Sequence, residues 1–89
     1  MNSSTEIIIY TKSWCGDCHR IKQLFDDYEV NYNEIDVESD PAYGRLIASL
    51  NNGNERVPTI VLTDGQIVVE PSNATMLQIL GLEQDDWLN

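Results

Sequence analysis

The stretch that decides the fold is 13–19, Ser-Trp-Cys-Gly-Asp-Cys-His, which directly follows the apolar run 7–10, Ile-Ile-Ile-Tyr. Cys15 and Cys18 are the only cysteines in the sequence. They are three residues apart where a helix is expected to begin, so they can form a disulfide across its first turn. A thiol at a helix N-terminus meets unpaired N–H groups and the positive end of the helix dipole, which favour the thiolate that attacks disulfides. The pair therefore indicates a redox centre.

The position of each cysteine predicts its role in that chemistry. If the helix begins near Cys15, this outer sulfur is the natural nucleophile, because the helix terminus favours its thiolate. Cys18 lies one turn deeper and is placed to attack the mixed disulfide and release the product. Gly16 allows the turn to bend, whereas the carboxylate of Asp17 opposes a second negative charge nearby. We therefore expect Cys15 and Cys18 to be the catalytic residues.

The composition is that of one globular domain. The chain has 89 residues, 42% hydrophobic and 22% charged, which predicts a single domain over 1–89 with a core of about 5–81 and a C-terminal tail at 82–89. The first residues have no basic region, and no apolar run approaches the roughly 20 residues that cross a bilayer. We therefore expect a cytoplasmic protein, in which a cysteine pair is typical of catalysis or metal binding.

The charge is acidic and unevenly placed. The formal net charge is −10, but residues 1–24 hold three cations against two acids, whereas residues 25–89 hold two cations against thirteen acids. Such a chain is a poor candidate for nucleic acid or an anionic membrane, so we expect neither as a partner. Most cations lie near the cysteines, where Lys12 would help to stabilise a thiolate or attract an anionic thiol substrate.

The spacing of apolar residues predicts an α/β fold in the order β-α-β-α-β-β-α. The expected strands are 6–10, 31–37, 59–63 and 66–69. The expected helices are 16–28, 41–50 and a last one that starts at 71–73 and stops at Gly81. A helix between the first two strands makes them a parallel, right-handed crossover, and the later hairpin adds an antiparallel pair. The result is a mixed four-stranded sheet with helices on both faces.

Turn residues and helical spacing predict the ends and inner faces of these elements. Asp40 followed by Pro41 is typical of a helix start, and Asp64-Gly65 indicates a two-residue hairpin turn. Gly44 weakens the second helix by about 1 kcal/mol relative to alanine. The expected inner face of the first helix is Cys18, Ile21, Leu24, Phe25 and Tyr28. The expected inner face of the second helix is Tyr43, Leu46, Ile47 and Leu50.

Two further residues extend the candidate site. Trp14, next to an exposed thiol, offers an aromatic platform for a substrate. Pro58 sits just before a strand, where proline lacks a ladder donor. A cis Val57–Pro58 bond would expose Val57 backbone groups for pairing with an extended substrate. Only roughly 5–6% of X-Pro bonds are cis, so spacing alone does not predict one here.

Three stretches together resemble the glutaredoxin family of the thioredoxin superfold. They are 11–18, Thr-Lys-Ser-Trp-Cys-Gly-Asp-Cys, then 52–59, Asn-Gly-Asn-Glu-Arg-Val-Pro-Thr, then 64–65, Asp-Gly. The likeness runs from about residue 5 to 80 and is closest to the bacterial mycoredoxin-like branch. The resemblance implies a thioredoxin-like fold with a cis Pro58 facing the cysteines, Cys15 as nucleophile and Cys18 as resolving thiol.

The resemblance also implies a substrate surface. Lys12, Arg56 and the Val57 backbone are expected to hold a low-molecular-weight thiol or a protein disulfide. Glutaredoxins usually carry Gly-Gly and then Ser or Cys followed by Asp after the last strand, whereas 69–73 here reads Val-Glu-Pro-Ser-Asn. The carboxylate added at Glu70 counts against glutathione as the natural partner. Ser72 remains a candidate substrate contact, with a helix N-cap as its alternative role.

Three other functions fit parts of the sequence. Cys-Gly-Asp-Cys-His at 15–19 also matches the signature for covalent c-type haem attachment, with His19 as axial ligand, although a strand precedes it and no export signal is seen. Two thiolates from each of two chains could bridge an iron–sulfur cluster, whereas a closed zinc site needs four ligands. A thioredoxin-like reductant of one protein partner would use the same cysteines and differ in what reduces it.

We interpret the chain as a cytoplasmic, monomeric dithiol oxidoreductase of glutaredoxin type. No bound cofactor or metal is needed, because the electrons travel through sulfur. A low-molecular-weight thiol such as glutathione or mycothiol is the expected donor, protein disulfides are the expected substrates, and a flavoprotein reductase is the alternative donor. The residues expected to form the substrate surface are Lys12, Trp14, Arg56, Val57, Pro58 and Ser72.

Overall fold

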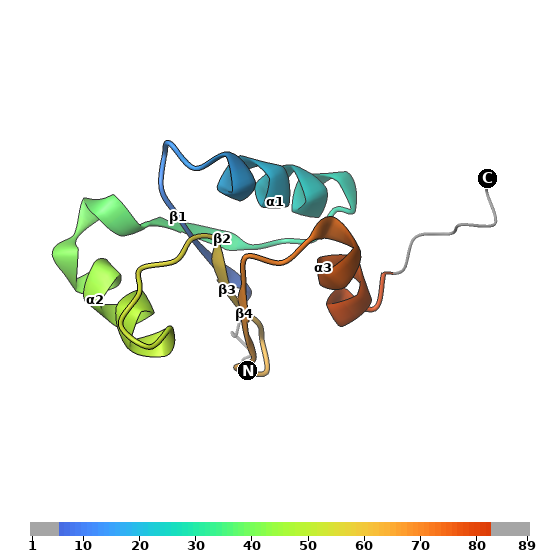
Figure 1. The fold of residues 1–89 in the computed structure, drawn as a ribbon. Helices are drawn as coiled ribbons and strands as arrows, with labels where there is room; N and C mark the ends of the chain where they lie inside the picture. Colours follow the sequence, from blue (N-terminus) through green and yellow to red (C-terminus); the bar gives the residue numbers. More distant parts are fainter. Residues whose placement is uncertain (1–5, 83–89) are drawn as a thin grey trace.

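The computed structural model describes residues 6–82. Its elements follow the predicted order, with one short 3-10 helix added after the second strand (Figure 1). They are β1 (Ile8–Thr11), α1 (Gly16–Asp27), β2 (Asn33–Asp36), η1 (Val37–Ser39), α2 (Pro41–Leu50), β3 (Thr59–Val61), β4 (Ile67–Val69) and α3 (Asn73–Leu80). The strands are shorter than predicted, and most of the predicted tail, 83–89, lies outside the described residues.

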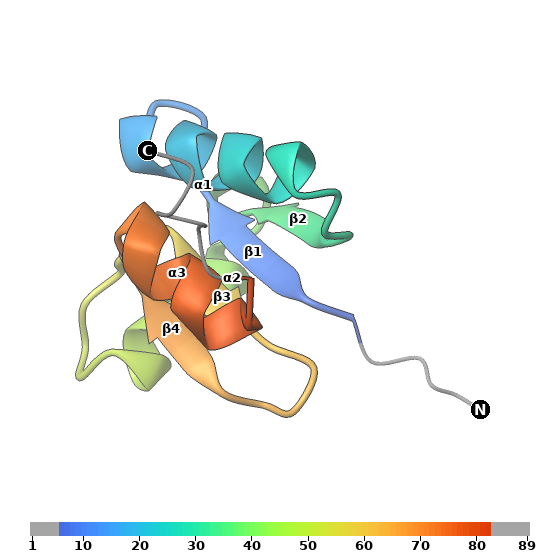
Figure 2. The same ribbon diagram turned by 90° about the vertical axis from the view of Figure 1, so that its right-hand side faces the viewer.

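The sheet has the strand order β2-β1-β3-β4. β1 pairs in parallel with β2 and antiparallel with β3, so that Ile9 faces Glu34 on one side and Ile60 on the other. β3 and β4 form an antiparallel hairpin. Figures 1 and 2 show α1 and α3 on one face of the sheet and α2 on the opposite face. The predicted mixed four-stranded sheet with helices on both faces is therefore confirmed.

Two apolar layers hold these elements together, one between the sheet and the helices α1 and α3, and one that extends from the start of α1 to α2. Successive residues of a strand point to opposite faces, so Ile9 packs under α1 and α3 while Tyr10 packs toward α2. The buried residues of the first layer are Ile9, Ile21, Leu24, Phe25, Ile60, Leu62, Val68, Met76 and Leu77. Those of the second layer are Tyr10, Cys15, Cys18, Val37, Ile47 and Val57.

The predicted inner faces of the helices need three corrections. Tyr28 is exposed because it caps the end of α1 instead of lying within the helix. On α2, Ile47 is fully buried, but Leu46 and Leu50 are 41% and 37% exposed. Leu46 lies about 100° around the helix from Ile47, and Leu50 is the last helical residue, so neither reaches the sheet. The buried stripe of α2 is therefore narrower than its apolar pattern suggests.

The helix ends follow local chemistry, as predicted. Asp40 caps α2 by accepting a hydrogen bond from the Ala42 N–H at 2.9 Å, with Pro41 at the first helical position. Gly81 ends α3 in the left-handed conformation, with φ of 75°. Among residues 6–82, the helices are too short or too polar for any of them to cross a membrane.

The hairpin between β3 and β4 differs from the predicted two-residue turn. The Leu62 N–H donates to the Gln66 carbonyl at 2.8 Å, which leaves the three residues 63–65 as the connection. Gly65 has φ of 90°, and its N–H donates back to the Leu62 carbonyl at 2.9 Å. A left-handed residue at the end of a three-residue loop matches the twist of the strands, so Asp-Gly here serves a longer turn than predicted.

A polar cluster ties α1 to the first two strands. One carboxylate oxygen of Glu34 accepts hydrogen bonds from the Lys22 ammonium at 2.9 Å and from the buried Thr11 hydroxyl at 2.7 Å. The hydrogen bond from Lys22, followed by that from Thr11, lowers the pKa of Glu34. The Glu34 carboxylate in turn raises the pKa of Lys22. Both shifts favour the charged pair.

Substitution of Ile60 tests the assigned apolar core. Ile60 is fully buried in β3, so Ile60→Ala is expected to lower the free energy of unfolding by about 2–5 kcal/mol through lost contacts and a cavity. Ile67→Ala, on the exposed side of edge strand β4, is the matched control and should cost less than about 1 kcal/mol. Urea unfolding measures both, and equal losses would contradict the assigned core.

Glu34→Gln tests the polar cluster through its pH dependence. Because the folded-state pKa of Glu34 is lowered, its contribution is present above the unfolded pKa and is lost as pH falls through the folded pKa. The variant is therefore expected to be less stable than wild type at pH 7, by up to about 1 kcal/mol for this partly exposed pair, with the difference shrinking below about pH 4. Glu29→Gln is the charge-matched control. A difference that does not change with pH would exclude this role for Glu34.

Candidate active site

Cys15 caps the N-terminus of α1. Its backbone is extended, with φ of −88° and ψ of 112°, and its Sγ accepts a hydrogen bond from the Cys18 N–H at 3.1 Å. The Cys15 N–H donates to the Lys12 carbonyl at 3.1 Å, which closes the turn between β1 and α1. The first sulfur therefore lies at the positive end of the helix dipole, with a donor directed at it. Such an arrangement stabilises negative charge on sulfur.

The two thiols differ in burial. Both are free, but Cys15 keeps 7% of its surface exposed, whereas Cys18 is fully buried. Burial, followed by the hydrogen bond with Cys15, raises the pKa of Cys18 to about 12. A hydrogen bond from the Lys12 backbone and the charge of Lys22 act in the opposite direction but do not outweigh burial. The exposed thiol expected from the sequence is therefore wrong in degree, because Cys15 is mostly buried and only 7% of its surface is open, with the protonated Cys18 thiol behind it.

The segment before β3 folds directly onto Cys15. The Val57–Pro58 peptide bond is cis, as the resemblance implies. The Cys15 thiol faces the Val57 carbonyl oxygen, with 3.8 Å between sulfur and oxygen. A backbone hydrogen bond fixes this segment to the residue that follows β4, because the Glu70 N–H donates to the Pro58 carbonyl at 3.0 Å. The fold therefore brings together two motifs that are 42 residues apart in sequence.

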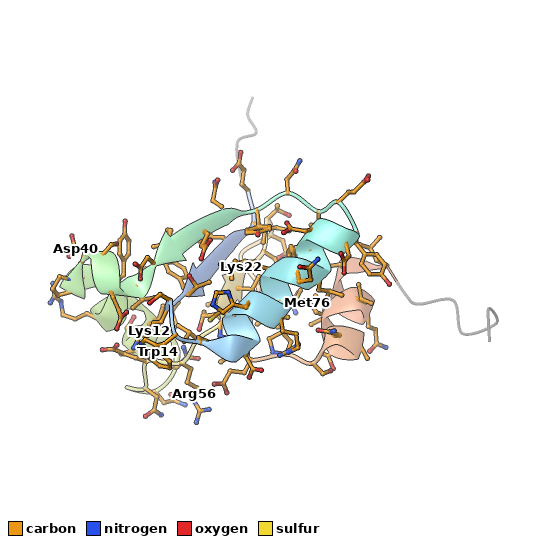
Figure 3. All side chains as sticks on the ribbon, turned by 90° about the horizontal axis from the view of Figure 1, so that it is seen from above. Lys12, Trp14, Lys22, Asp40, Arg56 and Met76 are labelled. Carbon is orange, nitrogen blue, oxygen red and sulfur yellow. The ribbon has the colours of Figure 1, made fainter. Side chains whose placement is uncertain are left out.

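Trp14 stands outside the core beside the thiol. It is 68% exposed, and its indole N–H donates to Glu38 at 3.3 Å. The Lys12 ammonium lies 5.5 Å from the centre of the indole, within the range of a cation–π contact. Figure 3 shows Lys12, Trp14 and Arg56 along one edge of the molecule near the start of α1. The indole is thus held between a cation and an acid, with much of its surface available for contact.

Both cations of the expected substrate surface are paired with carboxylates of this chain. The Lys12 ammonium lies 3.3 Å from Glu55, and its side chain is only 15% exposed. The Arg56 guanidinium lies 3.1 Å from Glu70 and is half-exposed. Any anion that binds at these cations competes with a carboxylate already in place.

Ser72 caps α3. Its hydroxyl accepts a hydrogen bond from the Thr75 N–H at 3.1 Å, which is the alternative role considered for it. Arg20 of α1 donates to the Asn73 side chain at 2.6 Å and to the Pro71 carbonyl at 3.1 Å. These bonds hold the start of α3 against α1. The contacts described for Ser72 belong to its own helix, whereas Cys15, Val57, Lys12 and Trp14 are linked to one another by direct contacts.

Two site residues, Glu38 and Glu55, are absent from the expectations drawn from the sequence. Glu38 binds Trp14 across 24 positions, and Glu55 binds Lys12 across 43 positions. Neither acid stands out in a sequence with fifteen acids. The stretch 52–59 contains Glu55, but nothing local indicates which cation it meets. These pairings are products of the tertiary fold.

His19 is the histidine that could serve as a metal or haem ligand. His19 is exposed on α1, and its Nε2 lies 3.0 Å from the Ser13 carbonyl. Within residues 6–82, no group of three or more His, Cys, Asp or Glu side chains is arranged to hold a metal ion. Among these described residues, Cys15, Cys18 and His19 therefore do not form a group that could hold a metal ion.

A cavity of about 220 Å³ lies away from the cysteines. It is lined by the β3–β4 loop and by the end of α3, together with Ile7 just before β1. Cys15 follows the other end of β1, so the cavity and the thiols lie toward opposite ends of that strand. The cavity is therefore separate from the candidate redox site at the cysteines.

Comparison with known proteins agrees with this geometry. The family model described as Glutaredoxin matches residues 7–68. The Mycobacterium tuberculosis protein named "Putative glutaredoxin MT3292" is 37% identical over 79 residues, covering 84% of this chain and 94% of that protein. Mycoredoxin 1 of Corynebacterium glutamicum is 33% identical over 73 residues, covering 82% of this chain and 90% of that protein.

Solved structures show the same fold. A mutant of the thioredoxin-like protein BC3987 superposes with a TM-score of 0.73 at 28% identity, covering 88% of this chain and 97% of that one. The glutaredoxin from Brucella melitensis gives a TM-score of 0.68 at 26% identity, covering 90% and 85%. With the family model covering more than half of the sequence and the cysteine pair at the start of α1, this chain belongs to the glutaredoxin family of thiol–disulfide oxidoreductases.

Proposed function

We propose that this protein reduces disulfides by a dithiol mechanism in which Cys15 attacks and Cys18 resolves. The observation that carries the proposal is the Cys15 Sγ at the N-cap of α1, accepting the Cys18 N–H, on the one cysteine of the pair that keeps exposed surface. The Cys15 thiolate attacks one sulfur of a substrate disulfide, forms a mixed disulfide and expels the other sulfur as a thiolate, which takes up a proton.

Resolution follows from the position of Cys18. Its sulfur attacks the Cys15 sulfur, the Cys15–Cys18 disulfide forms, and the substrate thiolate leaves and takes the proton that Cys18 releases. Two electrons have then passed from the protein dithiol to the substrate. Burial, followed by the hydrogen bond with Cys15, raises the pKa of Cys18 to about 12, so Cys18 has to give up its proton as it attacks.

The substrate surface in this proposal consists of the residues around Cys15. Trp14 provides an apolar platform, and the Val57–Pro58 segment provides backbone beside the attacked sulfur. Lys12 and Arg56 set the electrostatics of the approach, and Ser72 contributes at the N-terminus of α3. Protein disulfides and mixed disulfides with low-molecular-weight thiols are the substrates.

The electron donor in this proposal is a low-molecular-weight thiol, and the protein works as a cytoplasmic monomer of one domain. Two molecules of the thiol reduce the Cys15–Cys18 disulfide and become a disulfide themselves, so no bound cofactor takes part. The likeness to a mycoredoxin and to glutaredoxins supports this class of donor. The rate at which the Cys15–Cys18 disulfide is reduced distinguishes the donors. It is measured with each candidate as sole reductant: glutathione, mycothiol, bacillithiol or a flavoprotein thioredoxin reductase.

Single cysteine variants test the assigned roles. Cys15→Ser is expected to lower turnover of every disulfide substrate by at least about a thousandfold, because the attacking sulfur is lost. Cys18→Ser is expected to keep activity on small mixed disulfides, which need only Cys15, and to lose reduction of protein disulfides. The measurement is turnover of hydroxyethyl disulfide and of a disulfide-bonded protein with each donor. Retained activity in Cys15→Ser would reject the scheme.

Alkylation of the native dithiol tests the difference between the two thiols. At about pH 7, iodoacetamide is expected to modify Cys15 only, because Cys18 is fully buried and its pKa is raised to about 12. Since the native state holds the Cys18 proton more tightly than the unfolded state, reaction at Cys18 should increase with pH only in strongly alkaline solution. Peptide mass spectrometry identifies the modified residue, and protein unfolded in urea is the control in which both react. Equal labelling of the native thiols would contradict the assignment.

A further inference from the structure

The carboxylate of Glu55, a residue of the segment between α2 and β3, lies beside Gly44 of α2 in space that a side chain at position 44 would fill. A Cβ placed on Gly44 would lie 2.9 Å from Glu55 Oε2, 3.0 Å from its Cδ and 3.1 Å from its Oε1. An alanine at 44 would therefore force the carboxylate to move. Gly44 is buried in the middle of α2, where glycine costs helix stability relative to alanine. The space it leaves allows the Glu55 carboxylate to rest against the helix backbone.

From this position Glu55 restrains Lys12. Its Oε1 accepts a hydrogen bond from the Lys12 ammonium at 3.3 Å, and Lys12 is mostly buried. The same ammonium lies 5.5 Å from the centre of the Trp14 indole. The cation nearest to the attacking thiol in sequence is thus held between a carboxylate and an aromatic ring.

Pairing with a carboxylate is also found for three of the other four cations. Of the five lysines and arginines in the chain, four form ion pairs with carboxylates of the described residues. At the edge that carries the thiol, Glu38 and Glu70 add carboxylates beside Trp14 and Arg56. A substrate that carries its own carboxylates would have to displace these groups or lie next to them. Exposed like charges at close range disfavour such a complex.

We propose that Glu55, resting against Gly44, makes the site select thiols and disulfides without carboxylates near the reacting sulfur. This inference rests on the proposed function and specifies the substrate class of the same site. Glu55 is a positioning residue that acts through Lys12, because it neutralises the cation that would otherwise attract a substrate anion. Uncharged low-molecular-weight thiols, and protein disulfides in segments free of acids, are the favoured class.

A matched pair of disulfides measures this selection. The mixed disulfide of one neutral cysteine peptide with glutathione, and the same disulfide with glutathione diethyl ester, differ only in two carboxylates. Reduced protein transfers two electrons to either one, releasing the peptide thiol and the glutathione or ester thiol. Wild type is expected to reduce the ester faster. The ratio measured is the rate constant for the ester disulfide divided by that for the glutathione disulfide. In Glu55→Gln this ratio should fall by about two- to fivefold, the range for an exposed charge pair.

Three further variants separate the role of Glu55 from a general change of charge. Glu29→Gln removes one acid beyond the far end of α1 and should leave the ratio unchanged. Gly44→Ala keeps the charge of Glu55 but displaces its carboxylate from α2, so it should lower the ratio as Glu55→Gln does. In a Lys12→Met background, Glu55→Gln should change the ratio much less. High salt should reduce the preference in wild type, because it screens exposed charges.

The outcomes distinguish this inference from the proposed function. If the ratio is unchanged in Glu55→Gln, or falls only as much as in Glu29→Gln, the inference is overturned. The dithiol mechanism is still supported in that case, provided that the wild-type protein reduces the ester disulfide normally. Failure of wild-type protein to reduce either disulfide would overturn the proposed function and this inference with it. A ratio that falls in Glu55→Gln and Gly44→Ala but not in Glu29→Gln supports the role of Glu55.

Discussion

The candidate active site is built around the hydrogen bond between the Cys18 N–H and the Cys15 sulfur at the start of α1. That bond exists because β1 ends shortly before the helix, and because Cys15 takes the extended conformation of an N-cap. The same geometry leaves Cys15 with 7% of its surface exposed and Cys18 with none, although both belong to the second apolar layer. One short helix start therefore separates a reachable sulfur from a buried one, and this difference makes a sequential exchange chemically reasonable.

Around this centre the fold adds a set of polar and charged pairs. Lys12 meets Glu55, Trp14 meets Glu38, and Arg56 meets Glu70. Each contact joins segments far apart in the chain, so the electrostatic character of the surface is a property of the assembled fold. Gly44 illustrates the connection between packing and charge, because its missing side chain gives Glu55 its place. A residue that weakens α2 locally thus contributes to the environment of Lys12.

Much of the fold could be predicted because its signals are local. Asp40 with Pro41, and Gly81, mark helix ends through their own backbone preferences, and the structure places the start of α2 and the end of α3 there. Exposure at Leu46 and Leu50 was not predictable, since helical spacing shows which residues share a side but not how much of that side the sheet covers. The length of the β3–β4 turn depended on pairing between Leu62 and Gln66, which the Asp-Gly signal does not specify.

The sequence by itself determined the redox pair, the order of the elements and the family resemblance, because these depend on residue type and short-range spacing. Only the tertiary structure decided that burial raises the pKa of Cys18 to about 12, that the Cys15 thiol faces the Val57 carbonyl at 3.8 Å, and which acids meet the cations of the site. These properties arise between segments up to 43 residues apart. Distances between such segments are set by how the helices pack on the sheet, and no short stretch of sequence encodes them.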